Sequence, residues 1–367
     1  MPKKTLYIIL TIIICLIITG VLIWYFVLKP KEVAAPTGGI DFTVPGQIKN
    51  EGRIKIISQE PVISLSQING EIFFYDFSGQ LWQTPNEENK PIAVEEMSIN
   101  NLIDVVWSKD AKNIVKTGSE QADIKYILSD PAKKALVNLK SGIKSVAFSP
   151  DSKKIAYYFS PNSRENSLFT SDPDGKNQRT LSLELNLRDI TINWPNANTI
   201  ALASKPSGLV AGNLWFFDIR NFAINKIIDD LFGLEVLFST DGSSFIYSYA
   251  NEKGQDLKLA VYDAKGNSKI INNVSTLVDK CVFTKDQLNI YCAVPQSWPD
   301  FAVLPDDYYK NAFTTNDDIW KINTETGEKT LVFENISSIS NLAVSEDDAN
   351  IFFISRDNQL LFKLNLK

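Results

Sequence analysis

The densest group of chemically active side chains in the sequence lies in one segment, Pro295 to Asp317. It combines aromatic and acidic residues, namely Trp298, Phe301, Tyr308, Tyr309, Asp306 and Asp307. Aromatic side chains are enriched at binding hot spots, whereas disordered segments contain few of them. The segment therefore predicts a lid or a contact patch built from these six residues. The alternative is that the rings only cap the core beneath them.

Acidic residues in and beside this segment raise the question of a metal site. Asp306, Asp307, Asp317 and Asp318 could together bind Ca²⁺, which prefers oxygen ligands. No complete EF-hand loop accompanies them, so a solvated acidic loop is the favoured interpretation. The sequence predicts no metal site and no cofactor.

The chain contains no histidine, and this limits the chemistry available to it. Ser-His-Asp and Cys-His catalysis and all histidine-ligated metal sites are excluded within this sequence. No Gly-rich phosphate loop, Cys-x-x-Cys pair or nucleophile elbow occurs either. The sequence therefore predicts no catalytic residues and a protein that is not an enzyme.

Two of the three cysteines fall on neighbouring predicted strands. If the intervening turn runs from Lys285 to Leu288, Cys281 lies opposite Cys292. Opposed residues of antiparallel strands have Cβ atoms ~4.5–5.5 Å apart, close enough for a disulfide after a small adjustment. The alternatives are a disulfide, which would indicate an oxidising compartment, and two small residues buried in the sheet.

The overall composition is that of a globular protein, with 44% hydrophobic and 22% charged residues among 367. The formal net charge is −6, so the basic footprint typical of nucleic-acid binding is missing. We expect no nucleic-acid partner.

The N-terminal region predicts a membrane anchor. Residues 5–28 carry no charge, and about 20 apolar residues suffice to span a bilayer. A cleaved signal peptide would have a shorter apolar stretch and a small-residue cleavage site. We expect a retained single-pass helix over 5–28, after a cytoplasmic tail of residues 1–4.

Lysines flank the apolar segment on both sides, so the positive-inside rule barely discriminates between the two orientations. The short tail and the large C-terminal part favour a cytoplasmic N-terminus and an extracytoplasmic domain. Residues 29–51 are rich in proline and glycine and predict a linker between the anchor and that domain, residues 52–367.

The elements that must position these side chains come from an internal repeat. A strand–turn–strand module recurs with a period of about 40–45 residues, and one step is longer because of the segment Pro295 to Asp317. The apolar anchors of its second strand are Ile72, Ile114, Ile155, Ile200, Phe245, Ile290 and Ile351. Four short strands per repeat at this period are typical of a β-propeller blade. The sequence predicts an all-β fold, a seven-bladed propeller of four-stranded blades.

The two ends of the repeat region predict how the ring closes. The last repeat, residues 338–367, lacks a fourth strand, and residues 53–58 form an unassigned strand ahead of the first repeat. Adding residues 53–58 to the last blade would leave no open edge.

The third repeat carries a family resemblance. Phe148-Ser149-Pro150-Asp151-Ser152-Lys153-Lys154-Ile155-Ala156-Tyr157 resembles the W-S-P-D-G-x-x-I-A-F repeat of TolB-like propellers, and the turn beginning at Asp172 resembles the turn that follows it there. The resemblance, which extends to WD-repeat-like propellers in general, implies the fold. It implies function only broadly, since the family includes interaction proteins and the propellers of prolyl peptidases.

Together these features predict a membrane-tethered, non-catalytic binding or scaffold propeller at the cell envelope. Its partner would be a protein or a cell-wall component, bound through the face that carries residues 295–317. One alternative is a propeller hydrolase or lyase that uses carboxylate and tyrosine residues in the central channel. Another is a structural subunit of an envelope assembly.

Overall fold

The computed structural model describes residues 52–85, 90–118, 124–161 and 165–367. These residues belong to one compact unit, Gly46–Lys367. The predicted tail, anchor and linker (1–4, 5–28 and 29–51) lie outside the described residues. Within the described ranges, none of the helices has both the length and the apolar character needed to cross a membrane.

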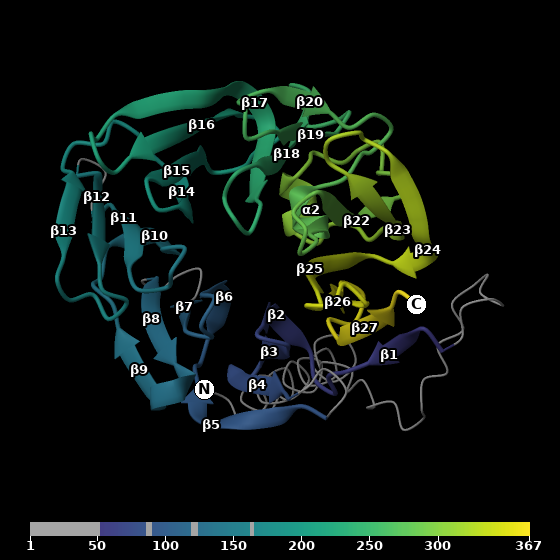
Figure 1. The fold of residues 1–367 in the computed structure, drawn as a ribbon, viewed down its shortest axis with the longest axis horizontal. Coiled ribbons are helices and arrows are strands. Elements are labelled where there is room, and N and C mark those ends of the chain that lie inside the picture. The colour runs from purple at the N-terminus through teal and green to yellow at the C-terminus, as the bar shows by residue number, and fades with distance from the viewer. Residues whose placement is uncertain (1–51, 86–89, 119–123, 162–164) are drawn as a thin grey trace, which may run out of the picture. The chain divides into compact units, whose positions relative to one another are not determined.

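The described chain is built from antiparallel sheets. Five sheets have four strands each, and a sixth has seven because the long strand β17 (Ile224–Phe238) pairs with a neighbour on each side. Counting β17 in both halves of that sheet, the strands form seven four-stranded units. Figure 1 shows these units following one another around a ring, as in a propeller.

The strands have the following bounds. The first three units contain β2 (Val62–Ile68), β3 (Glu71–Asp76), β4 (Gln80–Thr84) and β5 (Ile92–Ser98); β6 (Leu102–Trp107), β7 (Asn113–Thr117), β8 (Lys125–Asp130) and β9 (Ala135–Asn138); and β10 (Ile143–Phe148), β11 (Ile155–Phe159), β12 (Ser167–Ser171) and β13 (Arg179–Ser182). The next two contain β14 (Ile190–Asn196), β15 (Thr199–Ser204) and β16 (Ala211–Asp218), then β17, β18 (Phe245–Ala250), β19 (Lys258–Tyr262) and β20 (Ser268–Ile270). The last two contain β21 (Cys281–Phe283), β22 (Asn289–Pro295), β23 (Asn316–Asn323) and β24 (Lys329–Ser337), then β25 (Ile339–Val344), β26 (Asn350–Ser355) and β27 (Leu361–Asn365).

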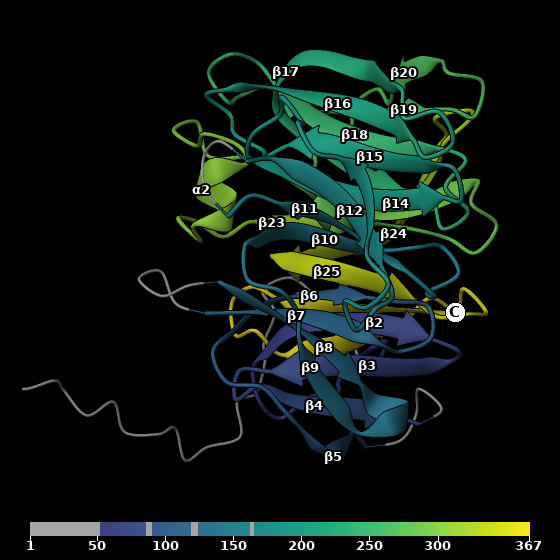
Figure 2. The same ribbon diagram turned by 90° about the vertical axis from the view of Figure 1, so that its left-hand side faces the viewer.

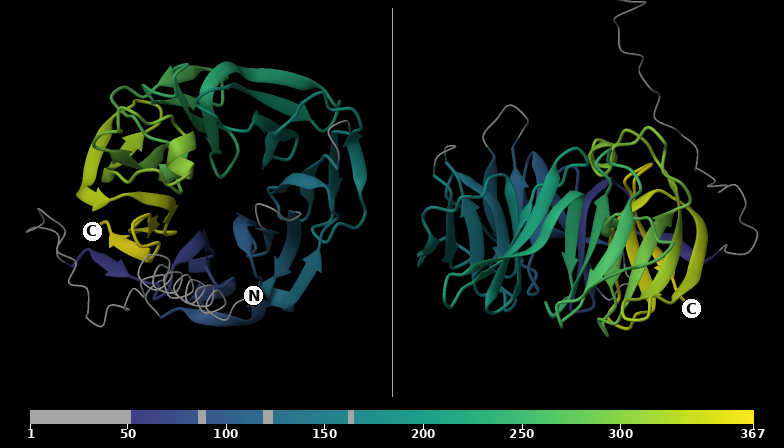
Figure 3. Two further views of the ribbon diagram at one scale, coloured as in Figure 1. Left: turned by 180° about the vertical axis from the view of Figure 1, so that it is seen from behind. Right: turned by 90° about the horizontal axis from the view of Figure 1, so that it is seen from above.

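The seventh unit is completed by the earliest strand. β1 (Ile54–Ile56) pairs with β27, with Ile54 opposite Leu364 and Ile56 opposite Phe362. The view from behind shows the first and last strands side by side in the ring (Figure 3). This pairing covers the edge of β27 that would otherwise be free, and it joins the two ends of the repeat region.

The core lies between the sheets. Each pair of neighbouring units encloses one hydrophobic cluster, to which both sheets contribute side chains. The seven second-strand anchors that reveal the repeat are all buried there, none more than 1% exposed. Because side chains of a strand alternate between its two faces, each sheet can pack against both neighbours. The repeat period is thus a consequence of this burial.

The first strands of the units face the centre of the ring. β2 lies beside β6 and β25, and β10 lies beside β6 and β14. Short 3₁₀ turns interrupt the pattern at Pro131–Lys133 (η2) and at Val278–Lys280 (η3), the latter directly before β21. The only α-helix in the described residues is the single turn α2 (Asp306–Tyr309), within the segment between β22 and β23. In the edge-on view α2 lies at one side of the ring (Figure 2).

Candidate functional site

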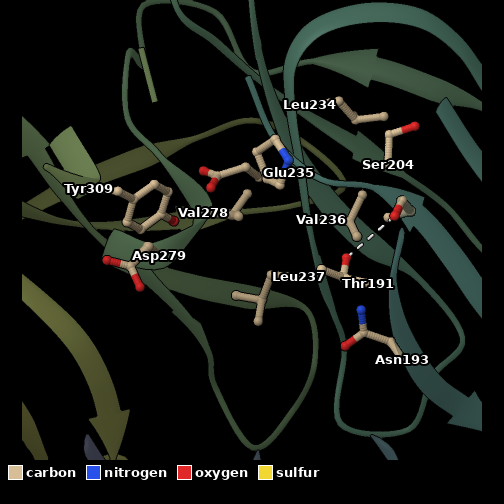
Figure 4. Close-up of a pocket in the computed structure, with 12 residues that line it drawn as sticks. Thr191, Asn193, Ser204, Leu234, Glu235, Val236, Leu237, Val278, Asp279 and Tyr309 are labelled. Carbon is tan, nitrogen blue, oxygen red and sulfur yellow. Dashed lines mark hydrogen bonds between the residues drawn. The ribbon is translucent and has the colours of Figure 1, made fainter. Parts of the chain in front are cut away.

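A cavity of about 280 Å³ opens among three units where the inserted segment meets the ring. Its lining comes from β14, β15, β17, η3 and α2 and consists of Thr191, Asn193, Ala203, Ser204, Pro206, Leu234, Glu235, Val236, Leu237, Val278, Asp279 and Tyr309. Half of these residues have aliphatic side chains. Figure 4 shows the Glu235 carboxylate pointing toward Tyr309, with Asp279 nearby.

Glu235 is the most unusual group of the cavity. Glu235 is only 7% exposed, and its Oε2 atom is buried without a hydrogen-bond partner among the described residues. Burial raises the pKa of Glu235 to about 8, the neighbouring Tyr309 hydroxyl opposes the rise, and the negative charges of Asp279 and Asp306 add to it. At neutral pH this carboxyl group therefore holds a proton and can donate it.

The backbone around Glu235 is shaped by a close approach of the inserted segment. Gly233 has φ +62, and a Cβ there would lie 2.9 Å from the carbonyl oxygen of Leu304. Its N–H donates to the carbonyl of Ser207 at 2.7 Å. Glycine at this position lets β17 turn from one sheet to the next while the inserted segment packs against it.

Asp279 is the second carboxylate of the cavity and is positioned by η3. The Tyr308 hydroxyl donates to Asp279 Oδ2 at 2.8 Å. Burial raises the pKa of Asp279, while the Tyr308 hydrogen bond and the positive charges of Lys280 and Arg356 oppose that rise. These opposing contacts stabilise the ionised form of Asp279.

A buried ion pair lies beneath this arrangement. Lys280 Nζ is 2.6 Å from Asp317 Oδ2, and both side chains are 0% exposed. Lys280 also donates to the carbonyl of Ile339, and the Ile339 N–H donates to Asp317 Oδ2. Burial lowers the pKa of Lys280, and the negative charge of Asp317 opposes this effect. The pair ties the sixth unit to the seventh, directly beside Asp279.

Tyr308 and Tyr309, both predicted contact residues, have different roles. Tyr308 is 1% exposed and is held by the Arg356 guanidinium, 3.7 Å above its ring. Tyr309 is 50% exposed, lines the cavity and lies in front of the Glu235 carboxyl group (Figure 4). Desolvation of its hydroxyl group and the adjacent carboxyl groups raise the pKa of Tyr309 well above its usual value, so the hydroxyl stays protonated at neutral pH.

The other predicted contact residues lie outside the cavity lining. The Trp298 Nε1 donates to Ser275, and its ring packs against Tyr308 and Phe313. Asp306 accepts hydrogen bonds from the Gly208 N–H and the Ser207 hydroxyl, and Asp307 accepts one from the Val303 N–H. Phe301 is 71% exposed. Trp298, Asp306 and Asp307 thus hold the inserted segment in place, and Phe301 points to solvent.

The acidic residues considered for Ca²⁺ do not converge. Asp317 pairs with Lys280, while Asp318 accepts from Gln296 and from the Asn335 N–H. Within the described ranges, no group of three or more potential ligand residues is arranged to hold a metal ion.

Cys281 and Cys292 form a disulfide, with their Cα atoms 4.1 Å apart. They are directly opposed in the pairing of β21 with β22, which is the register obtained by counting outward from the turn. The disulfide therefore lies immediately after Asp279 and Lys280 in the chain.

Sequence reasoning missed Glu235, Asp279 and Lys280. A signal was available in the residue three positions before the apolar residue near the end of each first strand (Trp107, Phe148, Trp194, Phe238, Phe283 and Val344). In six repeats this residue is polar, namely Asp104, Ser145, Thr191, Glu235, Lys280 and Asn341. Aligning that column would have drawn attention to the carboxylate of the fifth repeat and to the charged pair Asp279-Lys280 of the sixth.

No protein-family model matches the sequence, and no curated protein is similar to it. Solved structures are similar in fold. The β-propeller domain of the Trilobed protease from Pyrococcus furiosus has a TM-score of 0.59 at 12% identity, covering 85% of this chain and 97% of that one. An oligogalacturonate lyase in complex with manganese has a TM-score of 0.61 at 11% identity, covering 86% and 93%. Prolyl endopeptidases have a TM-score of 0.58 at 12% identity, covering 85% and 51%.

These comparisons confirm the propeller fold. The chain spans about half the length of the prolyl endopeptidases it resembles, so the likeness there concerns part of those proteins only.

The prediction that the chain is not an enzyme is wrong. The same fold occurs in an oligogalacturonate lyase and in peptidases. The prediction rested on the lack of histidine and of contiguous motifs. A propeller instead gathers single residues from separate repeats, and such a group leaves no local motif.

Proposed function

We propose that this protein is an enzyme that cleaves a glycan by acid–base chemistry, with Glu235 as the general acid and Asp279 as the general base. The observation that carries the proposal is the buried carboxyl group of Glu235, which lines the cavity and stays protonated at neutral pH. Two carboxyl groups in environments that separate their protonation states are the usual machinery for breaking a glycosidic bond.

The roles follow from the contacts of each group. Glu235 gives its proton to the glycosidic oxygen as the bond to the anomeric carbon breaks. Asp279 takes a proton from the water that forms the new bond to that carbon. Tyr309 lies in front of the Glu235 carboxyl group in the cavity, and Tyr308 orients Asp279 through its hydrogen bond. Likeness in fold to an oligogalacturonate lyase makes a glycan a reasonable substrate class, and the lack of histidine disfavours a Ser-His-Asp mechanism within this chain.

The test is a screen of the full-length protein against chromogenic glycosides and oligosaccharides, with release of reducing ends as the readout. Glu235→Gln and Asp279→Asn should each lower the rate by at least about a hundredfold, as expected for loss of a general acid or base. Glu328→Gln, at an exposed position, is the matched control and should leave the rate unchanged. Activity that survives both site variants would refute the assignment.

The pH profile adds a second criterion. Because Glu235 must be protonated to act as the acid, activity should fall as the pH rises through about 8. A rate that stays constant up to pH 10 would contradict the role of Glu235.

We also propose that residues 5–28 tether the protein to a membrane with the propeller outside the cytoplasm, where a cell-wall glycan or protein would be within reach. The uncharged apolar segment supports the tether, and the Cys281–Cys292 disulfide supports an oxidising compartment. Phe301, Leu209 and Val210 are exposed apolar side chains that such a partner could contact. Digestion of intact cells by an added protease, compared with lysed cells, tests this topology.

A further inference from the structure

The charges around the cavity limit which glycan it can accept. The cavity lining contains two carboxyl groups, Glu235 and Asp279, and no lysine or arginine. The negative charge of Asp306 adds to the potential at Glu235. The negative charge of Asp104, which lies in another part of the ring, adds to the potential at Asp279. A sugar that carries its own carboxylate would bring a further negative charge into this field.

Two positive charges that act on Asp279 have partners within the protein. Lys280 is paired with Asp317 and donates to the carbonyl of Ile339. Arg356 donates through Nη2 to the carbonyl of Tyr308 and to Asn311 Oδ1, and its guanidinium lies on the Tyr308 ring. Neither residue lines the cavity. A uronate carboxylate bound there would therefore find no lysine or arginine in the cavity lining to pair with.

An uncharged sugar has hydroxyl groups and an apolar ring face that complement the cavity lining. The buried Glu235 Oε2, without a partner among the described residues, can bond a hydroxyl group, which both donates and accepts. Leu234, Val236 and Val278 present an aliphatic wall suited to the C–H face of a pyranose ring. The volume of about 280 Å³ lies at the small end of ligand sites, which suits one monosaccharide unit rather than several.

We infer that the cavity binds an uncharged monosaccharide unit of its glycan and discriminates against uronates. The inference rests on the proposed function, and it differs from the anionic substrate named for the oligogalacturonate lyase of similar fold. A sugar carboxylate held near Asp279, which the proposed mechanism requires in its ionised form, should weaken binding about a hundredfold relative to the matched neutral sugar, from the Coulomb repulsion of two partly desolvated charges.

The experiment measures binding to the full-length Glu235→Gln variant, which cannot complete the acid step and so preserves its ligands. A glycan array presents each linkage in neutral and uronate forms, and calorimetry then compares the best neutral ligand with its uronate counterpart. Preference for the neutral form over the uronate by about a hundredfold is the expected result. Equal or tighter binding of the uronate form, or no glycan binding at all, overturns the inference.

A charge-introducing variant provides an independent arm. Thr191 is exposed and lines the cavity, so Thr191→Lys in the same background adds a cation without removing a catalytic group. It should gain uronate binding about tenfold relative to Thr191→Gln, its uncharged control, and unchanged uronate binding would count against the charge argument.

The two proposals can fail separately. Cleavage by the wild-type protein of uronate glycans alone would refute the inference and leave the proposed function standing. Binding of neutral glycans without cleavage by the wild type would refute the proposed function and leave the inference standing.

Discussion

Replacing Glu235 by glutamine should make the protein more stable at alkaline pH. The pKa of Glu235 is raised from 4.5 to about 8 in the folded state, so the folded protein holds a proton there that the unfolded chain has lost. The wild type should therefore lose stability as the pH rises from about 4.5 to about 8. Each pKa unit corresponds to about 1.36 kcal/mol, so ionising Glu235 in the folded state costs up to about 5 kcal/mol above pH 8.

Glutamine has nearly the same shape and cannot ionise. At pH 9 the Glu235→Gln variant should exceed the wild type in free energy of unfolding by several kcal/mol, up to the ~5 kcal/mol limit. At pH 5, where Glu235 is neutral in the folded state, the two should be similar. Urea unfolding of the full-length proteins from pH 5 to pH 9 measures the difference, with Glu328→Gln as the exposed control. Parallel pH profiles for wild type and Glu235→Gln would show that the buried carboxyl group is not held neutral, and would remove the basis of its acid role.

Three further predictions concern stability and can be measured by urea unfolding near neutral pH. Lys280→Met leaves Asp317 as an unpaired buried charge and should cost about 3–5 kcal/mol, whereas Lys154→Met, in an exposed pair with Asp172, should have little effect; equal effects would contradict the buried-pair argument. Gly242→Ala should destabilise the fold by about 1–3 kcal/mol more than Gly327→Ala. Both glycines have positive φ, but a Cβ at Gly242 would lie 2.0 Å from the Pro195 carbonyl oxygen, while Gly327 has open space, so similar losses would mean that this contact is unimportant. The double variant Cys281→Ala, Cys292→Ala should lose about 2–3 kcal/mol through the freed loop, and an unchanged midpoint under non-reducing conditions would rule out a stabilising disulfide.

The repeating fold could be predicted from the sequence because buried positions require apolar residues at a regular spacing. Residues such as Ile155 and Ile290 must be apolar since they are enclosed between two sheets, and one such buried position occurs in each unit. The turns also have a recurring sequence pattern. In five hairpins a Ser or Thr hydroxyl donates to an Asp two residues later, namely Ser108, Ser149, Ser239, Thr284 and Ser345. Both signals are local, so a single sequence is enough to detect them.

The burial of individual side chains in the inserted segment could not be predicted from the sequence. Its aromatic residues were correctly seen as unusual, but their types alone cannot tell a buried ring from an exposed one. Tyr308 is buried because Arg356 and Trp298 enclose it, and both come from other parts of the chain or of the segment. Its neighbour Tyr309 reaches the cavity because α2 presents consecutive side chains in different directions.

The site itself could not be read from the sequence in the same way. Glu235 and Asp279 belong to different repeats, and as single acidic residues they resemble any solvated carboxylate. Only the packing of β17, η3 and α2 around one cavity removes water from Glu235 and changes its chemistry.

The sequence by itself determined the strand pairs, the repeat, the register that opposes Cys281 to Cys292, and the exclusion of histidine chemistry. Each of these depends on residue types at fixed short spacing. The tertiary structure decided which carboxylates meet, which of them holds a proton, and which tyrosine faces the cavity. The reason is that desolvation and charge–charge interaction depend on distances in space, and the ring brings together residues that are far apart along the chain.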